Sequence, residues 1–189
     1  MKIHGTAKGG AISKKDFGVV FGSTPPVVTT WNQLENDYTF LISTGDHFAL
    51  GLEMQADSTI IGTGTVTDVQ FHFASNSASS GTITCCRWAD VSAMTGGNAA
   101  TVLSQADHTY WSRAVSGLDN GMSDETVTNS SELAEDNVVG FVVTDASGGD
   151  GASCRFEENE KFDTDPFRAS AGGTSAYSSA PAFTISTTD

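Results

Sequence analysis

The chain has 189 residues, the size of a single domain, and is long enough to bury roughly 70% of the surface that its unfolded form would expose. Nine Lys and Arg residues stand against 23 Asp and Glu residues, which gives a net charge of −14 at pH 7. This charge repels phosphate and argues against nucleic-acid binding by the globular part. No apolar run reaches the ~18 residues that a membrane-spanning helix needs.

The start of the chain differs from the rest in charge. Four of the nine basic residues lie within its first fifteen positions: Lys2, Lys8, Lys14 and Lys15. The remaining residues carry five basic and 23 acidic side chains, a net charge of −18. Pro25 and Pro26 follow, and two prolines forbid helix and favour extended chain. We therefore expect an extended basic N-terminal arm with a proline hinge at residues 1–26 and a single β-sandwich domain at residues 27–189.

The arm contains one β-prone run, FGVVFG at residues 17–22, which is suited to adding a strand to an exposed sheet edge. The lysines before it are attracted to acidic surfaces, including the body of an adjacent copy. We predict that the arm docks on another protein surface through Lys8, Lys14, Lys15, Phe17, Val19, Val20 and Phe21. Two other interpretations stay open: a disordered tail whose lysines give only solubility, and a contact with nucleic acid inside a shell.

After the arm, short segments rich in β-branched and aromatic residues alternate with Ser-, Gly- and Asn-rich loops, a pattern typical of strands in a sandwich. The predicted strands are residues 37–43, 47–54, 65–75, 81–88, 100–103, 110–115, 137–144, 152–157 and 181–187. Helical periodicity is nearly absent, and only residues 130–136 (SSELAED) could form a turn or two of helix. The fold class that follows is all-β: an antiparallel β-sandwich of jelly-roll type.

Two of these strands predict how the sandwich is layered. In TVTDVQFHFAS, residues 65–75, Val69, Phe71 and Phe73 alternate with polar residues, so one face is buried and the other faces water. NVVGFVVT, residues 137–144, is apolar on both sides. It therefore indicates a strand central to a sandwich, covered by a second sheet or by a neighbouring subunit.

The stretch IIGTGTVTDVQFHFASNSASSGTITCCRW, residues 60–88, resembles a recurring jelly-roll module in which a V-x-F strand and a polar loop precede a G-T-I-T strand. LAEDN before VVGFVVT is similar to the turn that follows in such modules. The resemblance covers residues 60–158, and Arg87 departs from it by replacing an apolar residue. It implies kinship with surface and appendage proteins of virus particles and with extracellular proteins, and it favours a trimer.

Acidic loops are the candidate metal ligands, because Ca²⁺ prefers carboxylate and carbonyl oxygens from a flexible loop. In DASGGDG, residues 145–151, Asp145 and Asp150 flank a glycine-rich bend and would be the first ligands. The alternative is a solvated acidic rim with no cofactor. The four histidines lie far apart, and no nucleophile elbow, zinc motif or phosphate-binding loop is present, so we expect no enzyme.

Aromatic residues define a second candidate site. Carbohydrate-binding sandwiches cover pyranose faces with exposed rings, and the candidates here are Trp31, Trp88, Tyr110 and Trp111. If residues 110–115 form a strand, alternation puts one ring of the Tyr110–Trp111 pair outward. By the same alternation Cys85 and Cys86 face opposite sides. A buried thiol beside a free or weakly exposed one is then favoured over a disulfide with Cys154.

These observations favour a non-enzymatic structural protein of a virus particle: a capsid, capsid-decorating or appendage subunit that docks through its arm on itself or on other virion proteins. Lysines and glycines interrupt any apolar signal region near the start, so we expect synthesis in a host cytoplasm without a signal peptide, followed by incorporation into virions. No membrane contact is expected. The alternative is a carbohydrate-binding module with exposed aromatic residues and loop-bound calcium.

Overall fold

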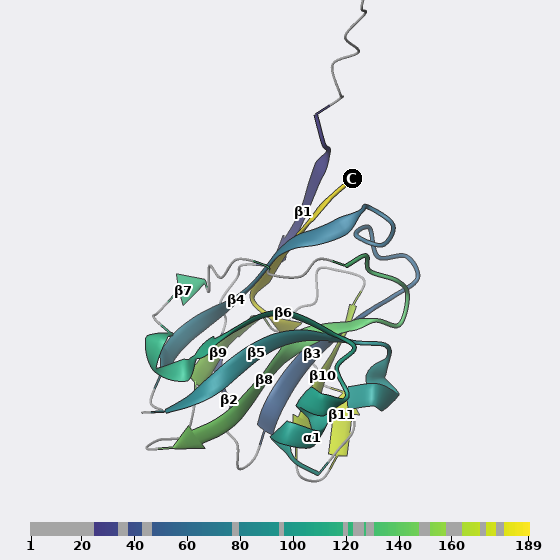
Figure 1. Cartoon of the computed structure of the whole chain (residues 1–189). Coiled ribbons are helices and arrows are strands. Elements are labelled where there is room, and N and C mark those ends of the chain that lie inside the picture. The colour runs from purple at the N-terminus through teal and green to yellow at the C-terminus, as the bar shows by residue number, and fades with distance from the viewer. Residues whose placement is uncertain are drawn as a thin grey trace, which may run out of the picture.

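The computed structural model describes residues 25–33, 38–42, 47–76, 80–94, 97–118, 121–122, 127, 131–147, 152–157, 164–170, 173–176 and 180–189. These residues form two antiparallel β-sheets that face each other (Figure 1), which confirms the predicted all-β class. Helix in this part of the chain is limited to α1 (Ala99–Ser104) and the 3-10 turns η1 (Val91–Met94) and η2 (Val115–Gly117). No described helix has the length and apolar character needed to cross a membrane.

The strands of the two sheets interleave in the sequence. The first sheet has the order β1 (Val28–Gln33), β13 (Phe183–Thr188), β4 (Thr65–Asn76), β9 (Ala152–Glu157) and β12 (Ala180–Pro181), with β2 (Tyr38–Ile42) on β9 and β7 (Gly121–Met122) on β4. The second has the order β11 (Gly173–Ala176), β10 (Thr164–Ser170), β3 (His47–Met54), β8 (Val138–Ser147), β5 (Ser80–Trp88) and β6 (His108–Ala114).

Most neighbouring strands come from distant parts of the sequence. The first and last described strands, β1 and β13, pair along their whole length from Val28 opposite Thr188 to Gln33 opposite Phe183. β13 also pairs with β4, and β8 lies between β3 and β5. Because these pairs close long loops, neither sheet can form from a local fragment.

The inner core fills the space between the sheets. Val69, Phe71 and Phe73 of β4 are fully buried there, which confirms the predicted alternation. Phe141 of β8 comes from the opposite sheet, and its ring meets Phe71 edge-on at a centroid distance of 4.8 Å and Phe73 at 5.5 Å. This edge-to-face geometry is favourable for aromatic pairs and joins the two sheets through their central strands.

A second core lies on the other face of the second sheet, under α1 and η1. Val138 and Val142 of β8 pack there with Met94 and Val102, while Val139 and Val143 point into the inner core. The prediction that NVVGFVVT is covered on both faces is therefore confirmed, but its outer cover is neither a second sheet nor a neighbouring subunit. It is a helical layer of the same chain, in which α1 lies against β3 and β8 (Figure 1).

The helix α1 occupies residues that we predicted as a strand from the density of Thr, Val and Leu at 100–103, and that prediction is wrong. Asn98 caps the helix by accepting a hydrogen bond of 2.9 Å from the N–H of Thr101, so the local capping signal prevails over β-propensity. The predicted helix at 130–136 is also wrong over its described residues. Glu132 forms a β-bridge with Thr65, and Asp136 has a φ of 67°, a left-handed conformation that ends any helix.

Gly140 of β8 lies against the backbone of β3, and we predict that it tolerates no side chain. A Cβ built there overlaps the carbonyl oxygen of Leu50 and lies 2.6 Å from the Cα of Gly51. Gly140→Ala should therefore lower the free energy of unfolding by about 3 kcal/mol, the upper range for overpacking. Gly97→Ala is the matched control, because a Cβ at Gly97 meets nothing within 4 Å. Urea unfolding of both variants measures the difference, and equal stabilities would contradict the close approach.

Candidate functional site

The residues predicted to dock the arm lie outside the described part of the chain: Lys8, Lys14, Lys15, Phe17, Val19, Val20 and Phe21. Pro25 is the first described residue, and residues 25–28 are all exposed. They lead directly into β1 at the edge of the first sheet. Residues 25–27 therefore enter the body at a sheet edge, not at a loop between covered strands.

The hydrogen-bonding pattern of β1 follows from its pairing with β13. Asp189 donates its N–H to the carbonyl oxygen of Val27 at 3.2 Å, so the backbone groups of Val27 point toward the β13 side. In an antiparallel ladder the direction alternates from residue to residue. The N–H and C=O groups of Val28, Thr30 and Asn32 therefore point to the opposite side. We call these outward groups the β1 edge, and no other strand of the described residues pairs with it.

The β1 edge has the chemistry of an interaction surface. Val27 and Val28 are 60% and 61% exposed and are the exposed large hydrophobic residues of the described part. The strand VTTWNQ has no charged residue, although the chain carries a net charge of −14. Proteins usually protect sheet edges with charges, bulges, prolines or very short strands. Among the other edge strands, β6 has a bulge and β11 has four residues, whereas β1 has six paired residues without a bulge. β2, the edge strand on β9, is also uncharged and has no bulge over its five paired residues.

The aromatic residues proposed for glycan binding do not form an exposed platform. Trp88 and Tyr110 have no exposed surface and Trp111 is 2% exposed. The indole N–H groups of Trp88 and Trp111 donate to the carbonyl oxygens of Val102 at 2.9 Å and Val69 at 2.7 Å. Both indoles are thus satisfied inside the protein. Trp31 lies in β1, and its side chain is outside the description.

A β-bulge explains why the expected outward ring of the Tyr110–Trp111 pair is absent. Trp111 lies opposite Cys85 and Thr109 lies opposite Cys86, so Tyr110 is an extra residue in β6 with no partner across the ladder. A bulge interrupts the strict alternation of side chains. Tyr110 and Trp111 consequently both enter the inner core. The prediction that one ring faces solvent is wrong for this reason.

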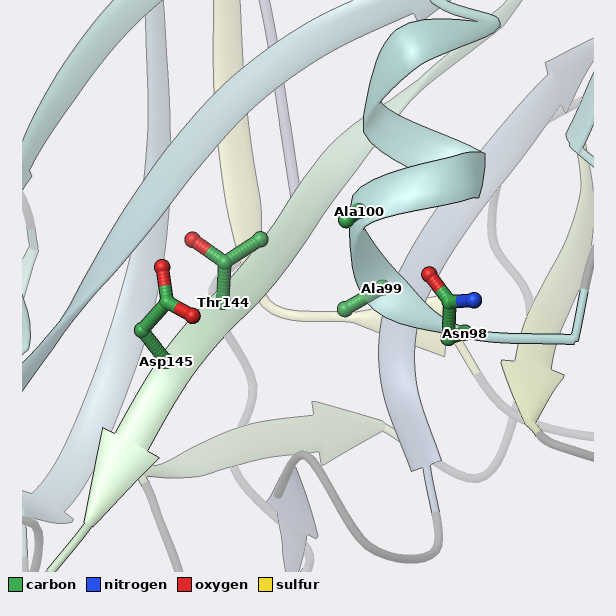
Figure 2. Close-up of a pocket in the computed structure, with 5 residues that line it drawn as sticks. All are labelled: Asn98, Ala99, Ala100, Thr144 and Asp145. Carbon is green, nitrogen blue, oxygen red and sulfur yellow. The ribbon is translucent and has the colours of Figure 1, made fainter.

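Asp145, the first proposed calcium ligand, lines a shallow pocket of about 340 Å³ at the end of β8. Figure 2 shows Asp145 and Thr144 across from Asn98, Ala99 and Ala100 at the start of α1. Asp145 is exposed and has a φ of 54°. The second proposed ligand, Asp150, lies outside the described residues. Within the described part, no three His, Cys, Asp or Glu side chains come together as a metal site.

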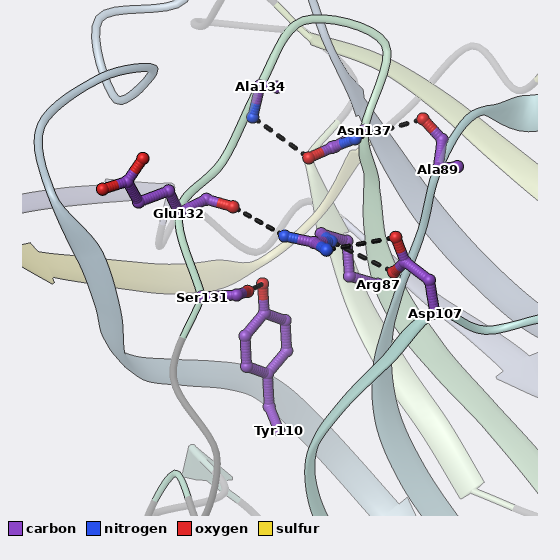
Figure 3. Close-up of polar contacts among 8 residues, drawn as sticks. All are labelled: Arg87, Ala89, Asp107, Tyr110, Ser131, Glu132, Ala134 and Asn137. Atoms are coloured by element: carbon purple, nitrogen blue, oxygen red, sulfur yellow. Dashed lines mark hydrogen bonds and ion pairs between the residues drawn. The ribbon is translucent and has the colours of Figure 1, made fainter.

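Arg87, the departure from the jelly-roll pattern, forms the main ionic contact of the described residues. Its guanidinium donates to both carboxylate oxygens of Asp107 at 3.1 Å each, and its third nitrogen donates to the carbonyl oxygen of Glu132 at 2.6 Å (Figure 3). The Arg87 side chain is 17% exposed and that of Asp107 is 39% exposed. A paired guanidinium thus replaces the expected apolar residue at this partly covered position.

Further bonds hold the loop of residues 131–137 between the two sheets. The carbonyl oxygen of Ser131 accepts a hydrogen bond of 2.7 Å from the N–H of Val66 in β4, and the hydroxyl group of Ser131 lies 3.2 Å from that of Tyr110. The side chain of Asn137 accepts from the N–H of Ala134 and donates to the carbonyl oxygen of Ala89 (Figure 3). We call the contacts of residues 131–137 with Val66, Arg87, Ala89 and Tyr110 the clasp. These contacts are structural, because they fix the position of the loop.

Cys85 and Cys86 face opposite sides of β5, as predicted, and both thiols are free. The expected contrast between a buried and a weakly exposed thiol is wrong, because a core covers each face and both thiols are buried. Burial raises the pKa of Cys85 well above its usual value and that of Cys86 to about 12. Both thiols are therefore protonated at neutral pH and behave as small apolar groups. The side chain of Cys154 lies outside the description.

Comparisons of the chain with models of protein families, with curated proteins and with solved structures found no match.

We predict that Arg87 and Asp107 contribute to stability as a coupled pair. Arg87→Met should destabilise the protein by about 2 kcal/mol, because Glu132 loses a charged donor and Asp107 loses its partner. Asp107→Asn should cost about 1 kcal/mol, and a double-mutant cycle should give a coupling energy of about 1 kcal/mol, as expected for a partly exposed pair. Urea unfolding supplies the four free energies. Strict additivity would mean that the pair does not contribute as a pair.

We also predict a loss of stability at alkaline pH. The folded-state pKa values of Cys85, Cys86 and Tyr110 are all raised, chiefly by burial. A group with a raised pKa stabilises the fold below its unfolded pKa, which is 9.0 for a thiol, and this stability is lost as pH rises toward the folded value. The free energy of unfolding should thus fall above pH 9, by up to about 1.4 kcal/mol per pH unit for each group. Cys86→Ala should reduce that slope, and an unchanged slope would contradict the assignment.

Proposed function

We propose that this chain is a structural subunit of a virus particle, as a capsid, capsid-decorating or appendage protein, which assembles with itself or docks on a shell through its N-terminal arm. The observation that carries the proposal is that residues 25–28 are exposed and lead into an uncharged strand at a sheet edge. An arm that precedes them would leave the body at this edge. A segment leaving from such an edge is placed to reach another subunit.

Charge segregation supports this role. The first fifteen residues hold four lysines and no acid, whereas the remainder carries a net charge of −18. A basic segment tethered to an acidic body is attracted to the acidic bodies of other copies. Charge of this kind selects partners and accelerates encounter, while apolar burial and strand pairing hold the contact.

The organisation of the body is also suited to a building block. Its two cores are buried by the chain's own strands and by α1, so the body needs no partner to cover β8. The order β1-β13-β4-β9 in the first sheet places the first and last described strands side by side, and the chain passes between sheets from β3 to β4 to β5. We propose on these grounds, and on the resemblance of residues 60–158 to virion modules, that the sandwich is of jelly-roll type.

Removal of the arm tests the proposal. The full chain should form oligomers or bind shells from its native source, and deletion of residues 1–22 should abolish shell binding and assemblies larger than a dimer while the body stays folded. Light scattering and native mass spectrometry measure assembly, and circular dichroism checks the fold. If the full chain remains monomeric at every concentration and binds no particle, the proposal is wrong.

Two arm variants separate the role of charge from that of strand pairing. Lys8→Gln, Lys14→Gln and Lys15→Gln together should weaken assembly at low salt and have little effect near 1 M salt, where screening acts within about 3 Å. Val19→Ser, Val20→Ser and Phe21→Ser together should weaken assembly at all salt concentrations. Both variants keep the arm at its natural length, so neither effect can be attributed to a shortened linker.

A further inference from the structure

We infer that the β1 edge pairs with the β1 edge of a second copy, so that two first sheets join into one continuous antiparallel sheet about a two-fold axis. This inference rests on the proposed function in one respect: it names the partner and the contact surface of the proposed self-assembly. The pairing uses described residues of the body, which makes it separable from the docking of the arm.

The edge is self-complementary in its hydrogen bonds. The outward backbone groups belong to Val28, Thr30 and Asn32, since Val27 bonds toward the β13 side and directions alternate along the strand. When two such strands run antiparallel about an axis at Thr30, each Thr30 faces its equivalent and each Val28 faces an Asn32. Every outward donor then meets an outward acceptor, as an isologous contact requires.

The side chains favour the same partner. Val28 is 61% exposed in the single chain and would be partly covered by the second strand. The strand carries no charge, so two copies can approach here although each chain has a net charge of −14. An unprotected, uncharged edge of this kind readily pairs with a further strand.

The prolines limit how the chain's own arm could cover the same edge. Pro25 and Pro26 fix φ near −65° and cannot be the central residues of a two-residue hairpin turn, so residues 17–22 could reach β1 only through another turn or a longer loop. In the two-fold pair, the start of one β1 lies beside the end of the other. A basic arm that precedes β1 would then start near the acidic body of the opposite copy. This placement is consistent with the charge attraction in the proposed function.

Self-cross-linking of Thr30→Cys tests the register directly. Opposed residues in a hydrogen-bonded antiparallel pair have Cα atoms ~5.5 Å apart, and their Cβ atoms lie too far apart for an unstrained disulfide. A short bifunctional thiol cross-linker, which spans this separation, should therefore convert the full-length variant into a covalent dimer. Ala100→Cys, at an exposed position on α1, is the control, together with the wild-type chain for its own cysteines. A Thr30→Cys variant that cross-links no more than the controls overturns the inference.

Thr30→Pro and Thr30→Ala form a matched pair for the backbone contact. Both lose the hydroxyl contact of 3.0 Å between Thr30 and Ser186, but only proline removes the outward N–H. Because that N–H is not used by β13, an edge proline leaves the monomer folded. Thr30→Pro should weaken dimerisation at least ~10-fold relative to Thr30→Ala, as measured by analytical ultracentrifugation with circular dichroism as the fold check. Equal dimerisation of the two variants overturns the inference.

Deletion of residues 1–22 in the Thr30→Cys background separates the two proposals. If cross-linking persists while larger assemblies disappear, the β1 edge pairs as inferred and the arm performs the further docking. If Thr30→Cys cross-links only after the deletion, the arm covers the edge in the full chain, and the inference falls while arm docking stands. If the edge cross-links and the deletion leaves larger assemblies intact, the proposed role of the arm falls and the edge pairing stands.

Discussion

The structure depends on the burial of β8 on both of its faces. Phe141 and its neighbours on one face meet Phe71 and Phe73 of the opposite sheet, while Val138 and Val142 on the other lie under α1 and η1. Between them, Gly140 allows the backbone of β3 to approach more closely than a side chain would permit. The first sheet ends at β1, an edge strand that follows the exposed residues 25–27.

Sequence patterns predicted the burial of those strands in which the order of apolar and polar residues stays regular from end to end. The alternation of Val69, Phe71 and Phe73 identified the inner face of β4, and the run NVVGFVVT identified a strand covered on both faces. Alternation failed at Tyr110, because a bulge has no signature in the residue types around it. β-Propensity failed at residues 100–103, where the Asn98 cap and two small alanines allow a short helix to lie on β8.

The contacts that shape the candidate surfaces are mostly non-local, and for this reason the sequence could not reveal them. Arg87 stood out as a charge where an apolar residue was expected, yet its partners, Asp107 and the carbonyl of Glu132, follow 20 and 45 positions later. The strand β1 has few apolar residues and was not predicted at all. It is fixed by β13 at the opposite end of the chain, a pairing that no window of local sequence contains.

Charge and strand pairing would act at different ranges in an assembly of this protein. Bodies of charge −18 repel one another over about a Debye length, ~8 Å at physiological salt, whereas an edge contact requires strands ~4.8 Å apart. Lysines from the arm of each copy offset part of this repulsion before the uncharged edges meet. In such a system the salt concentration sets the rate of encounter, while the hydrogen bonds and valines of the edge set the lifetime of the pair. An uncharged contact strand would therefore allow directed association although the acidic bodies repel one another.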